Sequence, residues 1–224
     1  MESKSWGKVL VALPAGLTRE QQLFFDAVDL LIPACQLQYQ RMRQTAAAYS
    51  DLQDSLDSSG DEITSQQLRD EATDIRAVLL ADEGSFAATI QRLRGVMNRL
   101  PGDPEIRIAK KAFEATVGAY EEARHYMEHL DTAIPKIVPT GHGALGGMAW
   151  HYMPMPDDLP MMFIIPGHLG AGATVGMRAA GSVKPPVDHI WATIGGADYN
   201  LTGAADAVDR LRERLAEWSA QWGQ

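Results

Sequence analysis

An apolar repeat at alternating steps of three and four residues constrains this chain most strongly, because it recurs in three long segments and a short fourth one. Its members in the first segment are Phe25, Val28, Ile32, Cys35, Tyr39, Met42, Ala46, Tyr49 and Leu56. In the third segment they are Ile106, Ala109, Phe113, Thr116, Tyr120, Ala123, Met127, Leu130 and Ile134. This spacing places one apolar stripe of a helix against a neighbouring helix. The repeat therefore predicts a bundle of long helices.

Capping and turn residues predict where the first two helices begin and end. Thr18 and Gln21 form a capping box that opens the first helix. That helix continues past Pro33 as one bent helix, because the repeat keeps its phase across the proline. The second helix covers about 61–99, and a change of phase at 82–85 predicts a stutter or a break there.

The later helices have signals of their own. Asp103 caps the third helix, which has Pro104 in its first turn and runs to about residue 134. Thr202 is expected to cap the last helix. The stripe of that helix is Val208, Leu211, Leu215, Trp218 and Trp222. Because the turns between the first three helices are short, these helices are expected to run antiparallel.

These assignments predict a mainly α protein of the α+β kind. The expected architecture is an elongated antiparallel bundle of three long helices plus a C-terminal helix, with a small β-containing lobe inserted before the last helix. The predicted segments are an extended N-terminus (1–17), the bundle (18–134), a lobe rich in Gly, Met and Pro (135–201), and a helix packing on the bundle (202–224).

Composition excludes several classes of partner and site. A net charge of −9 argues against binding of nucleic acid, because Lys and Arg must neutralise the phosphates. The single cysteine, Cys35, excludes an internal disulfide and any zinc site with several cysteines. Cys35 lies on the apolar stripe, so we expect it to be buried as a small hydrophobic residue. No cofactor is predicted.

The N-terminus and the lobe give no signal for a cleaved leader or a membrane span. Lys4 and Lys8 precede a short apolar run, but this run contains Pro14 and leads into a helix cap. In the lobe, prolines and the pair Asp157 and Asp158 interrupt every apolar stretch long enough to cross a bilayer. The predicted location is the cytoplasm, or the outside of the cell after export without a cleaved signal peptide.

Charge is distributed unevenly along the predicted bundle. The acidic residues around the first turn are Asp51, Asp54, Asp57, Asp61, Glu62, Asp70, Glu71 and Asp74, countered by Arg69. The basic residues around the second turn are Arg92, Arg94, Arg99, Arg107, Lys110 and Lys111. One interpretation is that these are solvated ends of hairpins. The other is docking to oppositely charged surfaces, including head-to-tail self-association.

The lobe differs in composition from the rest of the chain. Residues 137–177 contain six methionines, eight glycines and five prolines, and their only formal charges are Asp157 and Asp158. Short strands are expected at 160–166, 173–180 and 189–195, and the last should bury its alternate residues 190, 192 and 194. The lobe is either a packed subdomain or an exposed contact surface. In the second case its anchors are Trp150, Tyr152, Met161, Met162 and Phe163.

Two histidine groups are candidates for chemistry. Glu122, His125 and His129 share one face of the third predicted helix and have the Glu-x-x-His spacing of di-iron bundles. No second such motif accompanies them, so a solvated polar face is the competing interpretation. Lobe histidines, together with Asp157 or Asp158, are candidates for an acid–base site. These histidines are His142, His151 and His168.

The function predicted first is a non-catalytic interaction or assembly protein that uses the apolar lobe as a contact surface. Its partner would be another protein or a second copy of the chain. The alternative is a membrane-active helical protein, because the predicted architecture resembles in outline the pore-forming toxins that carry a hydrophobic β-tongue on a long helical bundle. A metal- or histidine-dependent enzyme is the second alternative.

Overall fold

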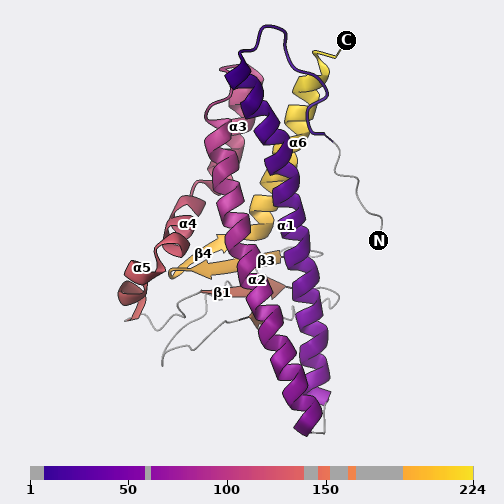
Figure 1. Ribbon diagram of the computed structural model, residues 1–224, viewed down its shortest axis with the longest axis vertical. Coiled ribbons are helices and arrows are strands. Elements are labelled where there is room, and N and C mark those ends of the chain that lie inside the picture. The colour runs from indigo at the N-terminus through magenta and orange to yellow at the C-terminus, as the bar shows by residue number, and fades with distance from the viewer. Residues whose placement is uncertain (1–7, 59–61, 139–145, 152–160, 165–188, 224) are drawn as a thin grey trace. The chain divides into compact units, whose positions relative to one another are not determined.

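The computed structural model describes residues 8–58, 62–138, 146–151, 161–164 and 189–223 (Figure 1). Its elements are, in chain order, α1 (Arg19–Ser58), α2 (Glu62–Met97), α3 (Pro104–Val117), α4 (Tyr120–Glu128), α5 (Leu130–Ile137), β1 (Gly147–His151), β2 (Met161–Ile164), β3 (His189–Ile194), β4 (Ala197–Asn200) and α6 (Leu201–Ala220). The predicted fold class is confirmed, since the chain is mainly helical with a small antiparallel sheet before the last helix.

The chain divides into two compact units. The first comprises Met1–Leu37, Phe86–Glu121 and Gly203–Gln224, and the second comprises Gln38–Ser85 and Glu122–Thr202. Both long helices, α1 and α2, therefore contribute to each unit. The predicted boundaries at residues 17, 134 and 201 stay a prediction. None of the described helices has a stretch that is both long and apolar enough to cross a bilayer.

Helix α1 begins and continues as the sequence predicts. The Thr18 amide donates to the Gln21 side-chain oxygen at 2.9 Å, and the Gln21 amide donates to the Thr18 hydroxyl at 3.2 Å, which confirms the capping box. The helix then runs through Pro33 without interruption. Cys35 is fully buried, and this burial raises the pKa of its thiol. The expectation that Cys35 is a small core residue is confirmed.

Helix α2 is continuous, so the break that the sequence allows at 82–85 does not occur, whereas a stutter would leave the helix unbroken. The side chains of Asp82 and Glu83 are buried, although polar residues rarely occupy such positions. They fall three and four residues after the buried Leu79, and Phe86 follows on the same face. The apolar stripe therefore continues through two carboxyl groups. Asp82 pairs with Arg41 of α1 at 3.0 Å.

The third predicted helix is three shorter helices, so the expectation of one unbroken helix from 104 to 134 is wrong. Its start is as predicted, because the Asp103 carboxylate accepts from the Glu105 amide at 2.8 Å. Gly118 follows the end of α3, and His129, with φ −128° and ψ 44°, separates α4 from α5. Gly118 keeps helical dihedral angles, whereas the non-helical backbone of His129 changes the phase of the stripe between α4 and α5. Ile134, expected on the stripe, is consequently 38% exposed.

The four-stranded antiparallel sheet has the order β2-β1-β3-β4. Strand β3 buries Ile190, Ala192 and Ile194 and leaves the residues between them partly exposed, so its predicted alternation is confirmed. Strand β2 lies within the predicted segment 160–166. Strands β1 and β4 are not predicted, and the predicted strand at 173–180 lies outside the described residues.

Thr202 does not cap the last helix, which begins at Leu201. Its hydroxyl instead accepts from the Ile190 amide at 2.8 Å and forms a 2.6 Å hydrogen bond with the Tyr39 hydroxyl. The residue is buried, so these two bonds satisfy a hydroxyl group that has lost its contact with water. Thr202 thereby links α1 to β3 in the second unit.

The first unit is built around contacts of α1 with α6 and with the segment that precedes α1. The ring of Phe25 stacks on Trp218 of α6 with 5.3 Å between the ring centroids. One carboxylate oxygen of Asp29 accepts from the amides of Val9 and Leu10 at 3.0 and 2.9 Å. These bonds satisfy the backbone of an irregular segment whose side chains are buried.

An arginine joins α2 to α3 in the same unit. Arg94 donates to both carboxylate oxygens of Glu114 at 2.7 and 2.8 Å and to Glu121 at 2.7 Å. These hydrogen bonds raise the pKa of the guanidinium further above its already high value. The basic charge predicted for this turn is thus partly neutralised at Arg94.

The buried carboxyl of Glu83 predicts an unusual dependence of stability on pH. Burial raises the pKa of Glu83 from 4.5 to about 8, and neither carboxyl oxygen has a hydrogen-bond partner among the described residues. Between these values the folded state keeps a proton that the unfolded state loses. The free energy of unfolding should therefore fall as the pH rises from about 4.5 to about 8.

Replacing Glu83 with Gln should remove this fall. We expect E83Q to exceed the wild type by about 4 kcal/mol in free energy of unfolding at pH 8, and to differ little near pH 4.5. Urea denaturation at a series of pH values measures the effect. The control is E71Q, which changes an exposed glutamate of the same helix. An E83Q protein with the wild-type dependence on pH would show that Glu83 is not buried as described.

Replacing two glycines, Gly195 and Gly95, with alanine should change the stability of the fold in opposite directions. Gly195 in the β3–β4 turn has φ +61°, and a Cβ atom there would lie 2.6 Å from the ring of Tyr126. Gly95 lies inside α2, where a Cβ atom would meet nothing within 4 Å. We expect G195A to lose on the order of 2 kcal/mol and G95A to gain about 0.5–1 kcal/mol of stability in thermal denaturation. Equal effects of the two substitutions would contradict this turn geometry.

Candidate functional site

The first candidate surface is a row of exposed leucines on α1, in the first unit. Leu23, Leu30 and Leu37 are spaced seven residues apart and are 50%, 74% and 48% exposed. We call these three residues the leucine stripe. A spacing of seven brings residues nearly into line along a helix. The stripe extends over about 21 Å of the helix axis at 1.5 Å per residue.

The leucine stripe lies opposite the buried stripe of the same helix segment. Phe25, Val28, Ile32 and Cys35 are fully buried, and a rotation of about 100° per residue places them on the far side of α1 from the leucines. Ala27 and Ala34 flank the leucine stripe and are partly exposed. This part of α1 is thus apolar on two faces, and the described residues cover only one of them.

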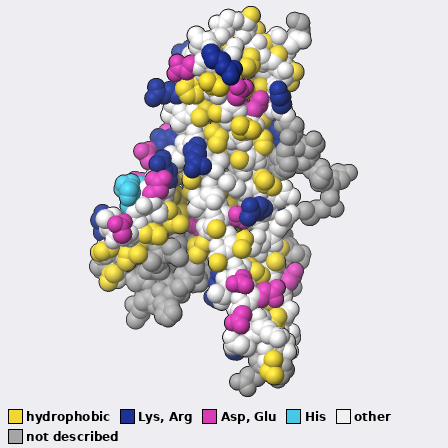
Figure 2. Space-filling model, in the orientation of Figure 1, with side chains coloured by type: hydrophobic (Ala, Val, Ile, Leu, Met, Phe, Trp, Pro, Cys, Tyr) yellow, Lys and Arg dark blue, Asp and Glu magenta, His cyan; other side chains and the backbone are white. Residues whose placement is uncertain are grey.

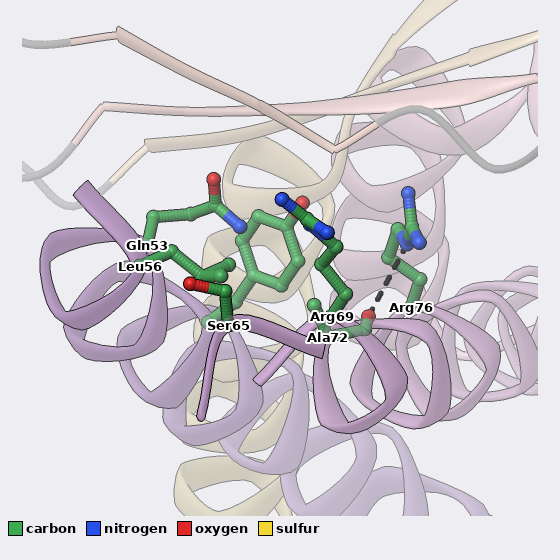
Figure 3. Close-up of a pocket in the computed structure, with 7 residues that line it drawn as sticks. Gln53, Leu56, Ser65, Arg69, Ala72 and Arg76 are labelled. Atoms are coloured by element: carbon green, nitrogen blue, oxygen red, sulfur yellow. Dashed lines mark hydrogen bonds between the residues drawn. The ribbon is translucent and has the colours of Figure 1, made fainter. Parts of the chain in front are cut away.

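The second candidate is a groove between α1 and α2 in the second unit. It has a volume of about 390 Å³. Its lining residues are Tyr49, Gln53 and Leu56 of α1 and Ser65, Arg69, Ala72 and Arg76 of α2. We call this pocket the arginine groove. Figure 3 shows the guanidinium groups of Arg69 and Arg76 on the same side of α2, together with the amide of Gln53.

The two arginines of the groove differ in how they are held. Arg76 donates from Nε to the Ala72 carbonyl at 3.2 Å and from one terminal nitrogen to the Thr73 hydroxyl at 2.9 Å. These bonds fix the orientation of its guanidinium group. The guanidinium of Arg69 forms no hydrogen bond or ion pair with any residue that the structure describes.

Acidic residues surround the groove but do not line it. Asp51, Asp54, Asp70, Glu71 and Asp74 are exposed, and Figure 2 shows acidic side chains gathered over this end of the α1–α2 hairpin. On α2 the acidic positions are rotated by roughly 100–200° from those of the arginines. Among the described residues, no carboxylate lines the groove. The exposed Arg69 and the partly buried Arg76 therefore line the groove with positive charge at a place where the surrounding surface is acidic.

The five predicted anchors of the lobe differ in what the structure says about them. Trp150 is 2% exposed, so its role as an exposed anchor is wrong, because it is a core residue of β1. Met161, Met162 and Phe163 form part of β2, and the register pairs Met162 with Trp150. Tyr152 lies outside the described residues, as do the side chains of 161–163. The contact role of these four residues stays a prediction.

The predicted metal trio is exposed to solvent. Glu122 and His125 lie on α4, whereas His129 lies at the break before α5, so the three residues do not share one helix. The two imidazole rings are 4.6 Å apart between centroids. Within the described parts of the chain, no group of three or more His, Cys, Asp or Glu residues is arranged to hold a metal ion.

The predicted acid–base site is only partly described. The backbone of His151 lies in β1, where the register places it opposite His189 of β3. His142, His168, Asp157 and Asp158 lie outside the described residues. Whether the histidines of the lobe act together stays a prediction.

Sequence reasoning did not identify the leucine stripe or the arginine groove. A signal for both exists in the sequence, because each set recurs at a spacing of seven residues. The periodic pattern of the core hides this signal, since the leucines resemble further core positions.

In comparisons with known proteins, the chain matches no protein-family model, no curated protein and no solved structure.

Proposed function

We propose that this protein is a non-catalytic assembly protein that self-associates through the leucine stripe of α1. The observation that carries the proposal is the exposure of Leu23, Leu30 and Leu37 in line on a helix whose opposite face is already buried. A surface helix of a globular protein ordinarily has one apolar face. A second apolar face at heptad spacing is typical of a helix that pairs with another helix.

The stripe is suited to a second copy of itself. In an antiparallel pair with a two-fold axis at Leu30, Leu23 of one copy faces Leu37 of the other, and Leu30 faces Leu30. The exposed Asp26 then lies opposite Ala34 of the second copy. A parallel pair would instead bring the two Asp26 carboxylates together. Repulsion between like charges favours the antiparallel arrangement.

The expected association is weak. Six partly exposed leucines in the pair would each gain about 1 kcal/mol when covered. The loss of translational and rotational freedom costs at least about 4 kcal/mol. The leucines alone leave a surplus of about 2 kcal/mol, which corresponds to a dissociation constant of tens of millimolar, and each further contribution of about 1.4 kcal/mol from flanking residues such as Ala27 and Ala34 lowers this constant about tenfold. The dimer is therefore expected to form at high protein concentration.

Replacing Leu30 with Lys should abolish the association, because it places two positive charges at the centre of the pair. We expect the wild type to sediment as a concentration-dependent mixture of monomer and dimer, and L30K to sediment as a monomer. The matched control is I108K, which changes a large apolar residue outside the leucine stripe that is 51% exposed on α3. Sedimentation velocity measures all three proteins.

A wild type whose sedimentation shows the same dependence on concentration as that of L30K, up to about 1 mM, would refute the proposal, because the weak association expected here must appear in the wild type alone. Loss of the dimer in I108K as well as in L30K would refute the role of the leucine stripe. Dye release from anionic liposomes by the wild type would favour the membrane-active alternative instead. Cytoplasmic location, or export without a cleaved signal peptide, is part of the proposal.

The predicted lobe surface is a separate contact candidate within the same functional class. It comprises Tyr152, Met161, Met162 and Phe163, without Trp150. The low charge and high methionine content of residues 137–177 support it. Because self-association through α1 does not use the lobe, the lobe would be available to a different protein partner.

A further inference from the structure

We propose that the arginine groove is a binding site for a small organic anion that carries an oxyanion, carboxylate or phosphate, at each of its two ends. The proposal goes beyond self-association, because the groove belongs to the second unit and shares no residue with the leucine stripe. Its basis is the placement of two guanidinium groups in a pocket whose described lining contains no carboxylate.

The charges of the hairpin are segregated in a way that favours an anion inside the groove. On α2, neither Arg69 nor Arg76 has an acidic residue three or four positions away, where helical neighbours form ion pairs. The carboxylates of Asp70, Glu71 and Asp74 lie on other faces of the helix. The positive charge of the groove is therefore not neutralised by its own helix.

The facing wall on α1 adds no negative charge. Tyr49, Gln53 and Leu56 provide a hydroxyl, an amide and an apolar side chain. Tyr49 is 7% exposed. Hydroxyl and amide groups donate hydrogen bonds to oxyanions, and a guanidinium group binds carboxylate or phosphate through two parallel bonds.

The spacing of the arginines indicates the form of the ligand. Seven residues separate Arg69 from Arg76, which is about 10 Å along the helix axis. Ala72 lies between them and is buried. Figure 3 shows Leu56 beside Ser65, on the side of Arg69 away from Arg76, so Ala72 is the apolar residue between the two arginines. An anion with two oxyanion groups joined by a carbon chain matches this order.

The volume of the groove selects a small molecule. Pockets for small ligands measure about 300–1,000 Å³, and the groove, at 390 Å³, lies at the lower end of this range. Because hydrogen bonds to Ala72 and Thr73 already orient the guanidinium of Arg76, this side chain loses little further entropy when a ligand binds. The guanidinium of Arg69, which has no partner among the described residues, would gain one from the ligand.

Calorimetric titration of the whole protein at low salt tests the proposal with named probes. The probes are suberate, an unbranched dicarboxylate, and fructose 1,6-bisphosphate, and the single-ended comparisons are octanoate and inorganic phosphate. We expect each two-ended probe to bind about tenfold more tightly than its single-ended comparison. The stronger of the two probes identifies whether carboxylate or phosphate is the preferred group.

Variants then assign the binding to the groove. We expect R69Q/R76Q to bind the better probe at least about tenfold more weakly, and R69K/R76K to lie between it and the wild type, because lysine keeps the charge but loses the planar fork. The matched control is R92Q/R99Q, which removes the same charge from exposed arginines outside the groove. Circular dichroism verifies that each variant is folded.

Three results would overturn the proposal. The first is a wild type that binds neither two-ended probe at about 10 mM. The second is equal affinity of the wild type and R69Q/R76Q. The third is equal affinity for the single-ended and two-ended probes. Sedimentation of R69Q/R76Q should match the wild type, so failure of the groove is distinguishable from failure of the leucine stripe.

Discussion

Burial of one apolar stripe of α1 is the constraint on which the first unit depends. The stack of Phe25 on Trp218 joins α1 to α6, and the Asp29 carboxylate holds the segment that precedes the helix. Phe25 and Asp29 lie about one helical turn apart, so both contacts use the same face of this part of α1. Once this face is committed to the core, the leucines on the other side have no place within the unit. The exposure of the leucine stripe is thus a consequence of how the core is built.

In the second unit, polar side chains join helices to one another and to the sheet. Thr202 joins α1 to β3 by two hydrogen bonds, and Arg41 joins α1 to α2 through Asp82. Glu83 is buried beside this ion pair without a described partner. Buried polar groups of this kind cost stability when they are not satisfied, so they restrict which arrangements of the chain are acceptable.

Local signals in the sequence predicted the helices well where one residue type determines the geometry. The capping box at Thr18 and the cap at Asp103 are read correctly, because each depends on residues that are close in the chain. A break in α2 was one of two alternatives, and it was considered because Asp82 and Glu83 occupy core positions with polar side chains. Thr202 was misread because its partners, Tyr39 and Ile190, are distant in sequence.

The candidate sites were harder to predict for a related reason. Periodicity shows that a residue belongs to a helical face, but it does not show whether a neighbour covers that face. Trp150 was expected at a surface and is buried, whereas Leu30 resembles a core residue and is exposed. Predicting the arginine groove requires knowledge of which α1 residues oppose Arg69 and Arg76. Only the structure of the α1–α2 pair provides this information.

Disulfide cross-linking of a Leu30→Cys variant tests the central claim most directly. Cys35 is buried and its thiol is held protonated, so the introduced thiol is the reactive one. In an antiparallel pair the two introduced thiols meet at the two-fold axis, and L30C should form a covalent dimer under mild oxidation. L23C should form far less, since Leu23 faces Leu37 of the other copy. No covalent dimer of L30C beyond that of I108C, or equal yields from L30C and L23C, would contradict the account.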